Sequence, residues 1–232
     1  MEKKITCALF DIDGTILNSE EVYARVNQEV INTFGNGKEY SWEVRRRVMG
    51  NKATMSSQII KESFDINIST EEIIAWKKVR MHELRNTIEL IPGTREIFRF
   101  LKSQGIKIAA ATSSQRKVFE SKMEQYQDVV EMFDVIVCGD DGEVKRSKPF
   151  PDIFIRAAEL CGETDMSKCV VFEDAIFGVM AGLASVAITI AIPDEHFKDD
   201  EVFSKAHHCL ETLSQFTPQM IGLQGSIEYQ SK

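Results

Sequence analysis

Five apolar runs of strand length recur along the chain, and each is nearly continuous rather than alternating with polar residues. They are residues 5–10, 106–111, 134–138, 169–172 and 187–192. Strands that are covered on both faces have this pattern. Amphipathic helical segments separate the later runs, and strands that alternate with helices form parallel sheets. The pattern therefore predicts an α/β fold whose parallel sheet is flanked by helices.

The stretch from Ser19 to about Ile88 breaks this alternation, because it contains helical patterns and no credible strand. Ser19 is the predicted N-cap of its first helix, since acidic residues follow directly. The chain thus leaves the sheet after one strand, builds a helical cap and then returns. We predict a core domain of residues 1–17 and 89–232 and a helical cap domain of residues 18–88.

The composition narrows the class of protein. The chain has 232 residues and a net charge of −8 at pH 7, whereas binders of nucleic acid or acidic membranes need a basic surface. No apolar run is long enough to cross a bilayer. Its five cysteines contain no CxxC pair, and their odd number favours free thiols in a reducing compartment. We expect a cytoplasmic monomer with no nucleic-acid or membrane partner.

The first apolar run ends in two carboxylates, Asp11 and Asp13, which are one residue apart. Buried charge is costly unless it is paired or bound to a cation, and neighbouring carboxylates repel each other. Alone, such a pair is more often a surface turn. Directly after a wholly apolar strand, it indicates a cation site.

Polar side chains follow the other predicted strands at the same end. Thr112 and Ser113 follow the second strand, Glu173 and Asp174 follow the fourth, and Lys148 lies in the loop after the third. Ligands of open parallel sheets bind beyond the carboxyl ends of the strands. Carboxylates hold Mg²⁺, and hydroxyl and ammonium groups bind phosphate oxygens. Together the segments predict phosphoryl transfer. Taken alone, Thr112 and Ser113 are as typical of a helix N-cap as of a phosphate site, and Lys148 is typical of a solvated loop.

Four segments carry a resemblance to a known family. In order along the chain they are DIDGT (11–15), ATSS (111–114), KPFPDIF (148–154) and VFEDAIFGV (171–179). Their order and spacing resemble the four motifs of the haloacid dehalogenase superfamily, and the helical insert resembles the cap of its β-phosphoglucomutase-like subfamily. The resemblance implies a Rossmann-like core with an inserted all-helical cap, and Mg²⁺ as the cofactor.

The resemblance also implies roles for the residues of these motifs. Asp11 matches the nucleophile that forms an aspartyl-phosphate, and Asp13 matches the general acid and base, whose backbone carbonyl also binds Mg²⁺. Asp174 matches a metal-binding carboxylate. Glu173 matches an acid beside it, which either binds the metal directly or hydrogen-bonds to one of the metal's ligands. Three further positions match, namely the phosphate-binding Thr112, the phosphate-stabilising Lys148 and the hinge Thr15. With Thr112 and Ser113, Thr15 is also a candidate for binding the phosphate.

The chain departs from the β-phosphoglucomutase pattern at several positions. It has Tyr23 where mutases carry a histidine, and Ala53, beside Lys52, where they carry an arginine. Both differences favour a phosphatase, and Tyr23 and Lys52 are candidates for the substrate-facing side of the cap. Val186 replaces the glycine that closes a late helix in relatives, so we expect that helix to end differently, because β-branched residues disfavour left-handed backbone.

Other conspicuous residues have simpler interpretations. The acids of 140–143 lack the spacing of a calcium loop, and the HHC segment (207–209) lacks the spaced partners of a metal site. Trp42 and Trp76 are expected to fill the core of the cap.

The sequence as a whole predicts a Mg²⁺-dependent phosphatase acting on a small phosphate monoester. Segments 40–60, 138–154 and 216–223 resemble the pseudouridine-5'-phosphatase group, which suggests a nucleoside or sugar monophosphate, with pseudouridine 5'-phosphate to be tried first. A phosphomutase and a phospho-ligand-binding protein without turnover remain the alternatives. A dehydrogenase and a serine hydrolase are excluded, because the chain has neither a GxGxxG after the first strand nor a GxSxG.

Overall fold

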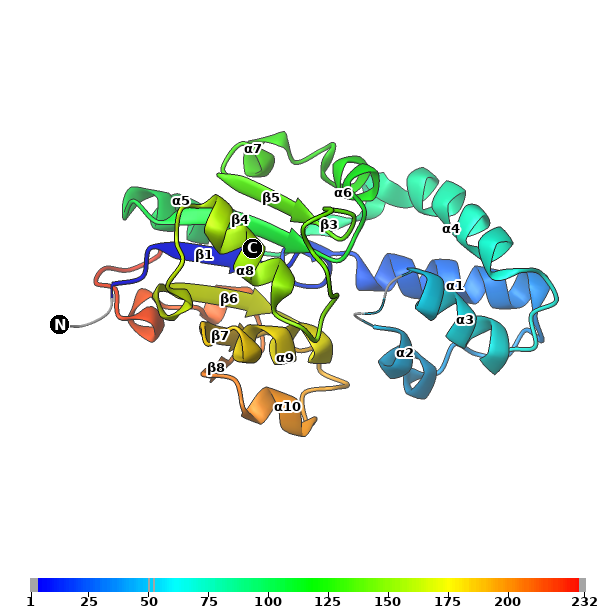
Figure 1. Cartoon of the computed structure of the whole chain (residues 1–232). Helices are drawn as coiled ribbons and strands as arrows, with labels where there is room; N and C mark the ends of the chain where they lie inside the picture. Colours follow the sequence, from blue (N-terminus) through cyan, green and yellow to red (C-terminus); the bar gives the residue numbers. More distant parts are fainter. Residues whose placement is uncertain (1–3, 50, 52, 230–232) are drawn as a thin grey trace.

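A computed structural model of the chain describes residues 4–49, 51 and 53–229. The strands within them are β1 (Cys7–Phe10), β2 (Leu17–Asn18), β3 (Glu89–Leu90), β4 (Lys107–Thr112), β5 (Val135–Cys138), β6 (Cys169–Glu173), β7 (Ile188–Ala191) and β8 (His208–Cys209). Six of them form a parallel sheet in the order β5-β4-β1-β6-β7-β8 (Figure 1). The predicted α/β fold with a parallel sheet is confirmed.

Helices cover both faces of the sheet. The α-helices are α1 (Glu20–Phe34), α2 (Trp42–Val48), α3 (Ala53–Ser63), α4 (Thr70–Leu84), α5 (Thr94–Ser103), α6 (Arg116–Met123), α7 (Gln127–Val130), α8 (Asp152–Leu160), α9 (Ile176–Ala184) and α10 (Glu201–Ser204). The 3-10 helices are η1 (Arg85–Thr87), η2 (Met166–Lys168), η3 (Leu213–Gln215) and η4 (Pro218–Ile221). Successive side chains of β1 belong to two different buried clusters, one shared with α5 and α6 and the other with α8 and α9. This two-sided burial explains why the strand sequences do not alternate.

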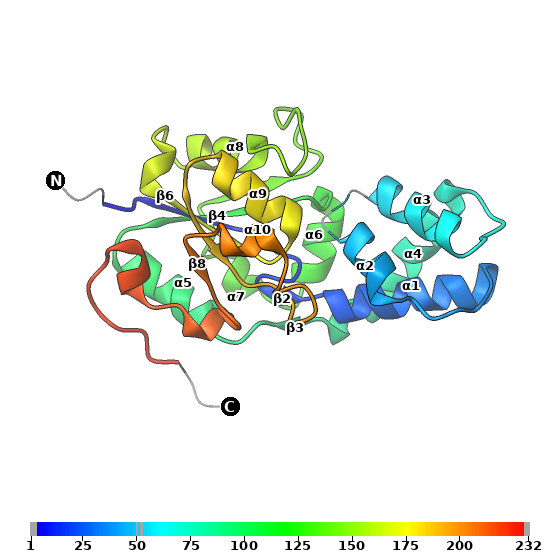
Figure 2. The same cartoon turned by 90° about the horizontal axis from the view of Figure 1, so that it is seen from below.

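The helices α1 to α4 form a separate group beyond one end of the sheet, as Figures 1 and 2 show. They pack around a cluster of their own, which includes Val30, Ile31, Ile60 and Ile73. The antiparallel pair of β2 and β3 lies where the chain leaves the core and returns to it, with Leu17 opposite Leu90. The sequence did not reveal this pair, because strands of two residues carry no periodicity. The domain boundaries at 18 and 88 stay a prediction.

The residue before α1 differs from its predicted role. Ser19 does precede the helix, but its side chain makes no capping hydrogen bond. Its hydroxyl instead donates to Asp13 Oδ1 at 2.7 Å. An ionised carboxylate is a strong hydrogen-bond acceptor, so the Ser19 hydroxyl donates to Asp13 and does not cap the helix.

Trp42 does not fill the core of the cap, and that prediction is wrong. Its ring is 39% exposed and stacks on His196 of the core, with 3.6 Å between ring centroids. It also contacts the Phe197 ring edge-on, and Arg46 of the same helix forms an ion pair with Asp200. The aromatic stack and the ion pair join α2 to the core.

The prediction for Val186 is also wrong. The backbone of Val186 adopts φ +62°, so this residue takes the left-handed conformation that glycine takes at the end of many helices. The backbone N–H of Val186 donates to the carbonyl of Leu183, and the Val186 side chain is 70% exposed. A β-branched residue is therefore held in a strained conformation with little packing to compensate.

Val186→Gly is expected to raise the free energy of unfolding by roughly 0.5–1 kcal/mol, because it relieves this strain and removes no buried side chain. Urea denaturation measures the change. The control is Val79→Gly at a 62% exposed position inside α4, which is expected to lower stability. Equal losses at both positions would contradict the strain.

Candidate active site

Neighbouring strands of the sheet end together and carry the predicted polar residues. Thr112 is the last residue of β4, Glu173 is the last residue of β6, and Asp11 directly follows β1, which lies between them. The register pairs Phe10 with Phe172, and their rings stack with 4.3 Å between centroids. The residues that follow this pair, Asp11 and Glu173, therefore come side by side.

Lys148 lies between two of the carboxylates. Its ammonium contacts Asp11, lies 2.5 Å from Glu173 Oε1 and donates to the carbonyl of Ala111 at 3.1 Å. Only 8% of Lys148, 6% of Asp11 and 1% of Glu173 are exposed. Burial disfavours the ammonium, but the two carboxylates outweigh it and raise the pKa of Lys148.

Asp174 completes an acidic cluster. The carboxylate oxygens of Asp11, Glu173 and Asp174 lie within 4.8 Å of one another. Burial raises the pKa of Asp11 to about 7, Lys148 lowers it in part, and Glu173 raises it again. Burial and the Glu173 carboxylate hold the pKa of Asp174 well above its usual range. The Lys148 ammonium pairs with two of the three carboxylates, those of Asp11 and Glu173. The oxygen-rich cluster therefore fits the expected Mg²⁺, which would neutralise the surplus charge.

Two glycines let the backbone approach the acids closely. Gly14 has φ +86°, and a Cβ atom there would lie 2.0 Å from Asp174 Oδ2. A Cβ atom on Gly178 would lie 1.8 Å from Glu173 Oε1. Any other residue at these positions would displace the carboxylates.

The acids are also held by hydrogen bonds. Glu173 Oε2 accepts from the backbone N–H of Asp174 at 3.0 Å and of Ala175 at 3.1 Å. The Thr15 hydroxyl donates to Asp174 Oδ1 at 3.2 Å, and Thr15 is fully buried. Thr15 thus supports Asp174 in this structure rather than facing the cavity, where a phosphate contact was expected.

The hydroxyl groups of Thr112 and Ser113, at the end of β4, lie on the opposite side of Asp11 from Glu173. Thr112 and Ser113 both line the cavity at the end of the sheet. Thr112 is 1% exposed, and its Oγ1 accepts from the backbone N–H of Ser114 at 3.0 Å. This bond orients the hydroxyl, so its hydrogen is left for another acceptor.

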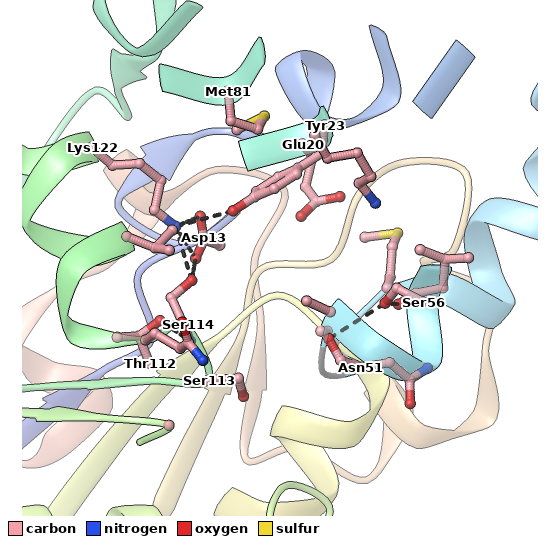
Figure 3. A pocket seen from close by; sticks show the side chains of 18 of the residues that line it. Asp13, Glu20, Tyr23, Asn51, Ser56, Met81, Thr112, Ser113, Ser114 and Lys122 are labelled. Carbon is pink, nitrogen blue, oxygen red and sulfur yellow. Dashed lines mark hydrogen bonds and ion pairs between the residues drawn. The ribbon is translucent and has the colours of Figure 1, made fainter. Parts of the chain in front are cut away.

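Asp13 is surrounded by donors that the sequence did not single out. Lys122 pairs with both of its carboxylate oxygens, and the Ser114 hydroxyl donates to Oδ2 at 3.0 Å (Figure 3). Burial would raise the pKa of Asp13, but Lys122 and the hydroxyls hold it below its usual range. A signal for Lys122 existed, because Lys122 shares the buried side of α6 with Phe119 and Met123.

A cavity of about 1050 Å³ lies between the cap and the sheet and is lined by Asp11, Asp13, Lys148 and Asp174. Tyr23 of α1 lines it from the cap side, with its hydroxyl 3.3 Å from Lys122 Nζ. The prediction for Lys52 lies outside the described residues.

The cap also brings two charged residues that the sequence did not single out as candidates. Glu20 and Lys77 both line the cavity. Burial and the nearby Asp13 raise the pKa of Glu20 to about 7. Burial lowers the pKa of Lys77 to about 8. Nothing in the helical periodicity distinguishes these residues from solvated ones, because the cap and the core come together only in the fold.

The chain belongs to the haloacid dehalogenase-like hydrolase family, whose model matches residues 8–192. The solved β-phosphoglucomutase of Clostridium difficile has the same fold, with a TM-score of 0.78 over 94% of this chain and 95% of that one, at 20% identity. The resemblance that the motifs indicated is thereby confirmed.

Curated relatives are similar along nearly the whole chain. A glycerol-3-phosphatase of Arabidopsis thaliana, (DL)-glycerol-3-phosphatase 1, is 31% identical over 94% of this chain and 74% of its own length. A Drosophila melanogaster protein named as a probable pseudouridine-5'-phosphatase is 30% identical over 95% of each chain. With the family match, these relatives place the chain among the phosphoric monoester hydrolases.

Among the described residues, no helix combines the length and the apolar character needed to cross a membrane.

Without a divalent cation, the stability of the protein is expected to fall as the pH rises from about 4 to about 7. Between the ordinary pKa of Asp11, 3.8, and its raised value of about 7, the folded protein keeps a proton that the unfolded chain has released. The measurement is urea denaturation in chelator, taken as the difference between wild type and Asp11→Asn. Mg²⁺ is expected to abolish the trend. In chelator, a free energy of unfolding of wild type that rises with pH relative to that of Asp11→Asn would contradict the burial argument.

Proposed function

We propose that the protein is a Mg²⁺-dependent phosphatase that hydrolyses a small phosphorylated metabolite through an aspartyl-phosphate on Asp11. The observation that carries this proposal is the position of the Asp11 carboxylate. It lines the cavity, contacts the Lys148 ammonium and lies within 4.8 Å of the Glu173 and Asp174 oxygens. A carboxylate can act as a nucleophile on phosphorus when nearby cations offset the charge of the phosphate.

The reaction has two steps. A carboxylate oxygen of Asp11 bonds to phosphorus while the bond between phosphorus and the leaving oxygen breaks. Asp13 reacts here in its protonated form, which its lowered pKa makes the minor form in the free protein, and gives its proton to that oxygen. A water oxygen then bonds to phosphorus, Asp13 takes the proton of the water, and the bond between phosphorus and Asp11 breaks.

The remaining residues bind and neutralise the phosphate. Thr112 and Ser113 hold its non-bridging oxygens, and Lys148 offsets the charge gathered between nucleophile and phosphate. Mg²⁺, held by the carboxylates of Asp11 and Asp174 and the backbone carbonyl of Asp13, with Glu173 beside them, supplies further charge neutralisation.

The cap, proposed as residues 18–88, closes the cavity over the leaving group. A volume of about 1050 Å³ has room for a nucleoside or sugar monophosphate. The relatives named for pseudouridine 5'-phosphate and glycerol 3-phosphate support a small polar alcohol as the leaving group, with pseudouridine 5'-phosphate tried first. We place the reaction in the cytoplasm, because all five cysteines are free thiols, as is usual in a reducing compartment. We propose that the protein acts as a monomer.

Asp11→Asn is expected to lower phosphate release by at least about 10³-fold, because it removes the nucleophile. The assay follows phosphate released in Mg²⁺ from a panel of pseudouridine 5'-phosphate, pyrimidine nucleotides, FMN, glycerol phosphates and hexose phosphates. Asp199→Asn, at an exposed acid of the core, is the control and should keep wild-type activity. Wild-type turnover by Asp11→Asn would refute the nucleophile, and interconversion of hexose phosphates without net release would favour a phosphomutase.

Asp174→Asn is expected to raise the Mg²⁺ concentration needed for half-maximal activity by about tenfold or more, because it removes a charged ligand. Chelator should abolish wild-type activity, and added Mg²⁺ should restore it. Glu143→Gln, at an exposed acid in the loop after β5, is the matched control and should leave the requirement unchanged. An unchanged requirement in Asp174→Asn would exclude Asp174 as a ligand.

A further inference from the structure

The Asp13 carboxylate is fixed by three side chains from three different elements. Ser19, just before α1, donates to Oδ1 at 2.7 Å, and Ser114, after β4, donates to Oδ2 at 3.0 Å. Lys122 of α6 pairs with both oxygens. Each oxygen thus accepts from a hydroxyl and from the ammonium, which leaves the carboxylate one orientation.

The Lys122 ammonium contacts Asp13, Ser114 and Tyr23. Its Nζ lies 3.1 Å from Ser114 Oγ and 3.3 Å from the Tyr23 hydroxyl, and only 3% of the residue is exposed. Burying an ammonium is costly, so a lysine at this place on an otherwise apolar helix face needs the carboxylate, and the carboxylate needs the lysine. Figure 3 shows Asp13, Ser114 and Lys122 at one side of the cavity, with Tyr23 reaching them from the cap.

We propose that Lys122 is a positioning residue of the phosphatase reaction, which aims the Asp13 carboxylate at the leaving oxygen. The proposal rests on the proposed function, because it concerns the residue assigned there to proton transfer. Lys122 lies outside the four motif segments and touches Asp13 rather than the phosphate-binding hydroxyls Thr112 and Ser113.

Tyr23 extends this assignment to the cap. It belongs to α1, whereas Lys122 belongs to α6 of the core, so their contact joins the two parts beside the cavity. The position of Asp13 therefore depends on the cap as well as on β1, which it follows in the chain. Tyr23→Phe, which removes one neutral contact, is expected to have a smaller effect than loss of Lys122.

The test compares two substrates whose leaving groups differ in basicity, because proton donation matters only where the leaving oxygen is basic. The rate of Asp11 phosphorylation is measured by rapid quench, in single turnovers with excess enzyme and Mg²⁺. The substrates are p-nitrophenyl phosphate, whose leaving group needs no proton, and pseudouridine 5'-phosphate or the best alkyl phosphate of the panel. Lys122→Met is expected to slow phosphorylation by the alkyl phosphate about 10²–10⁴-fold and to leave phosphorylation by the aryl phosphate near wild type.

A double-mutant cycle separates positioning from other roles. If Lys122 acts through Asp13, Lys122→Met should cause no further loss in an Asp13→Asn background. Lys122→Arg keeps the charge and should recover part of the alkyl phosphate rate. The control is Lys198→Met, which removes an exposed cation that does not line the cavity and should leave both rates unchanged.

Three results would overturn the proposal. The first is that Lys122→Met slows both substrates equally. The second is that the rate losses of Lys122→Met and Asp13→Asn multiply in the double mutant. The third is that Lys122→Met has wild-type rates. Should Lys122→Met fail to fold, Lys122→Arg decides, because the same preference for the aryl substrate is expected and its absence contradicts positioning. Absence of any phosphorylation in the wild type refutes the proposed function instead, so the two failures are distinguishable.

Discussion

Lys148 lies between the buried carboxylates of Asp11 and Glu173, and much of the local structure is required by that arrangement. Charges without water are tolerated only when each has a partner in a fixed position. The parallel pairing of β1 with β6 sets the spacing of the two strand ends, and the stacked rings of Phe10 and Phe172 pack against each other just before them. Gly14 and Gly178 leave the space that the carboxylates occupy. The apolar sheet therefore acts as the support that keeps like charges close together.

Each of the two acids of the first motif has its own lysine. Lys148 pairs with Asp11 toward the acidic cluster, and Lys122 pairs with Asp13 toward the cap. The first pair lies where phosphate would be attacked, and the second lies where the leaving group would depart. The surroundings of the two carboxylates differ in the structure. Burial raises the pKa of Asp11 and would raise that of Asp13, but Lys122 and the hydroxyls around Asp13 hold its pKa below the usual range.

Much of the sheet and of its edge could be predicted from sequence, because both rest on strong local signals. Continuous apolar runs marked the strands, and Asp11, Glu173 and Asp174 stood out as acids directly after them. What could not be predicted depended on contacts between distant segments. Lys122 stands out only as a lysine on the buried side of its helix, and its partner Asp13 comes from the fold. Trp42 joins the core through His196 and Phe197, which lie far from it in sequence. Val186 shows the converse, since the surrounding fold imposed a conformation that local preference disfavours.

The central claim is that the Asp11 carboxylate attacks phosphorus beside a divalent cation. The most direct test is a crystal structure grown with Mg²⁺ and beryllium fluoride, a mimic of the phosphoryl group. The account predicts beryllium bonded to a carboxylate oxygen of Asp11, with the other oxygen and Asp174 on Mg²⁺ at about 2.1 Å. Beryllium fluoride bound elsewhere, with the Asp11 carboxylate turned away from both the fluoride and the metal, would contradict it.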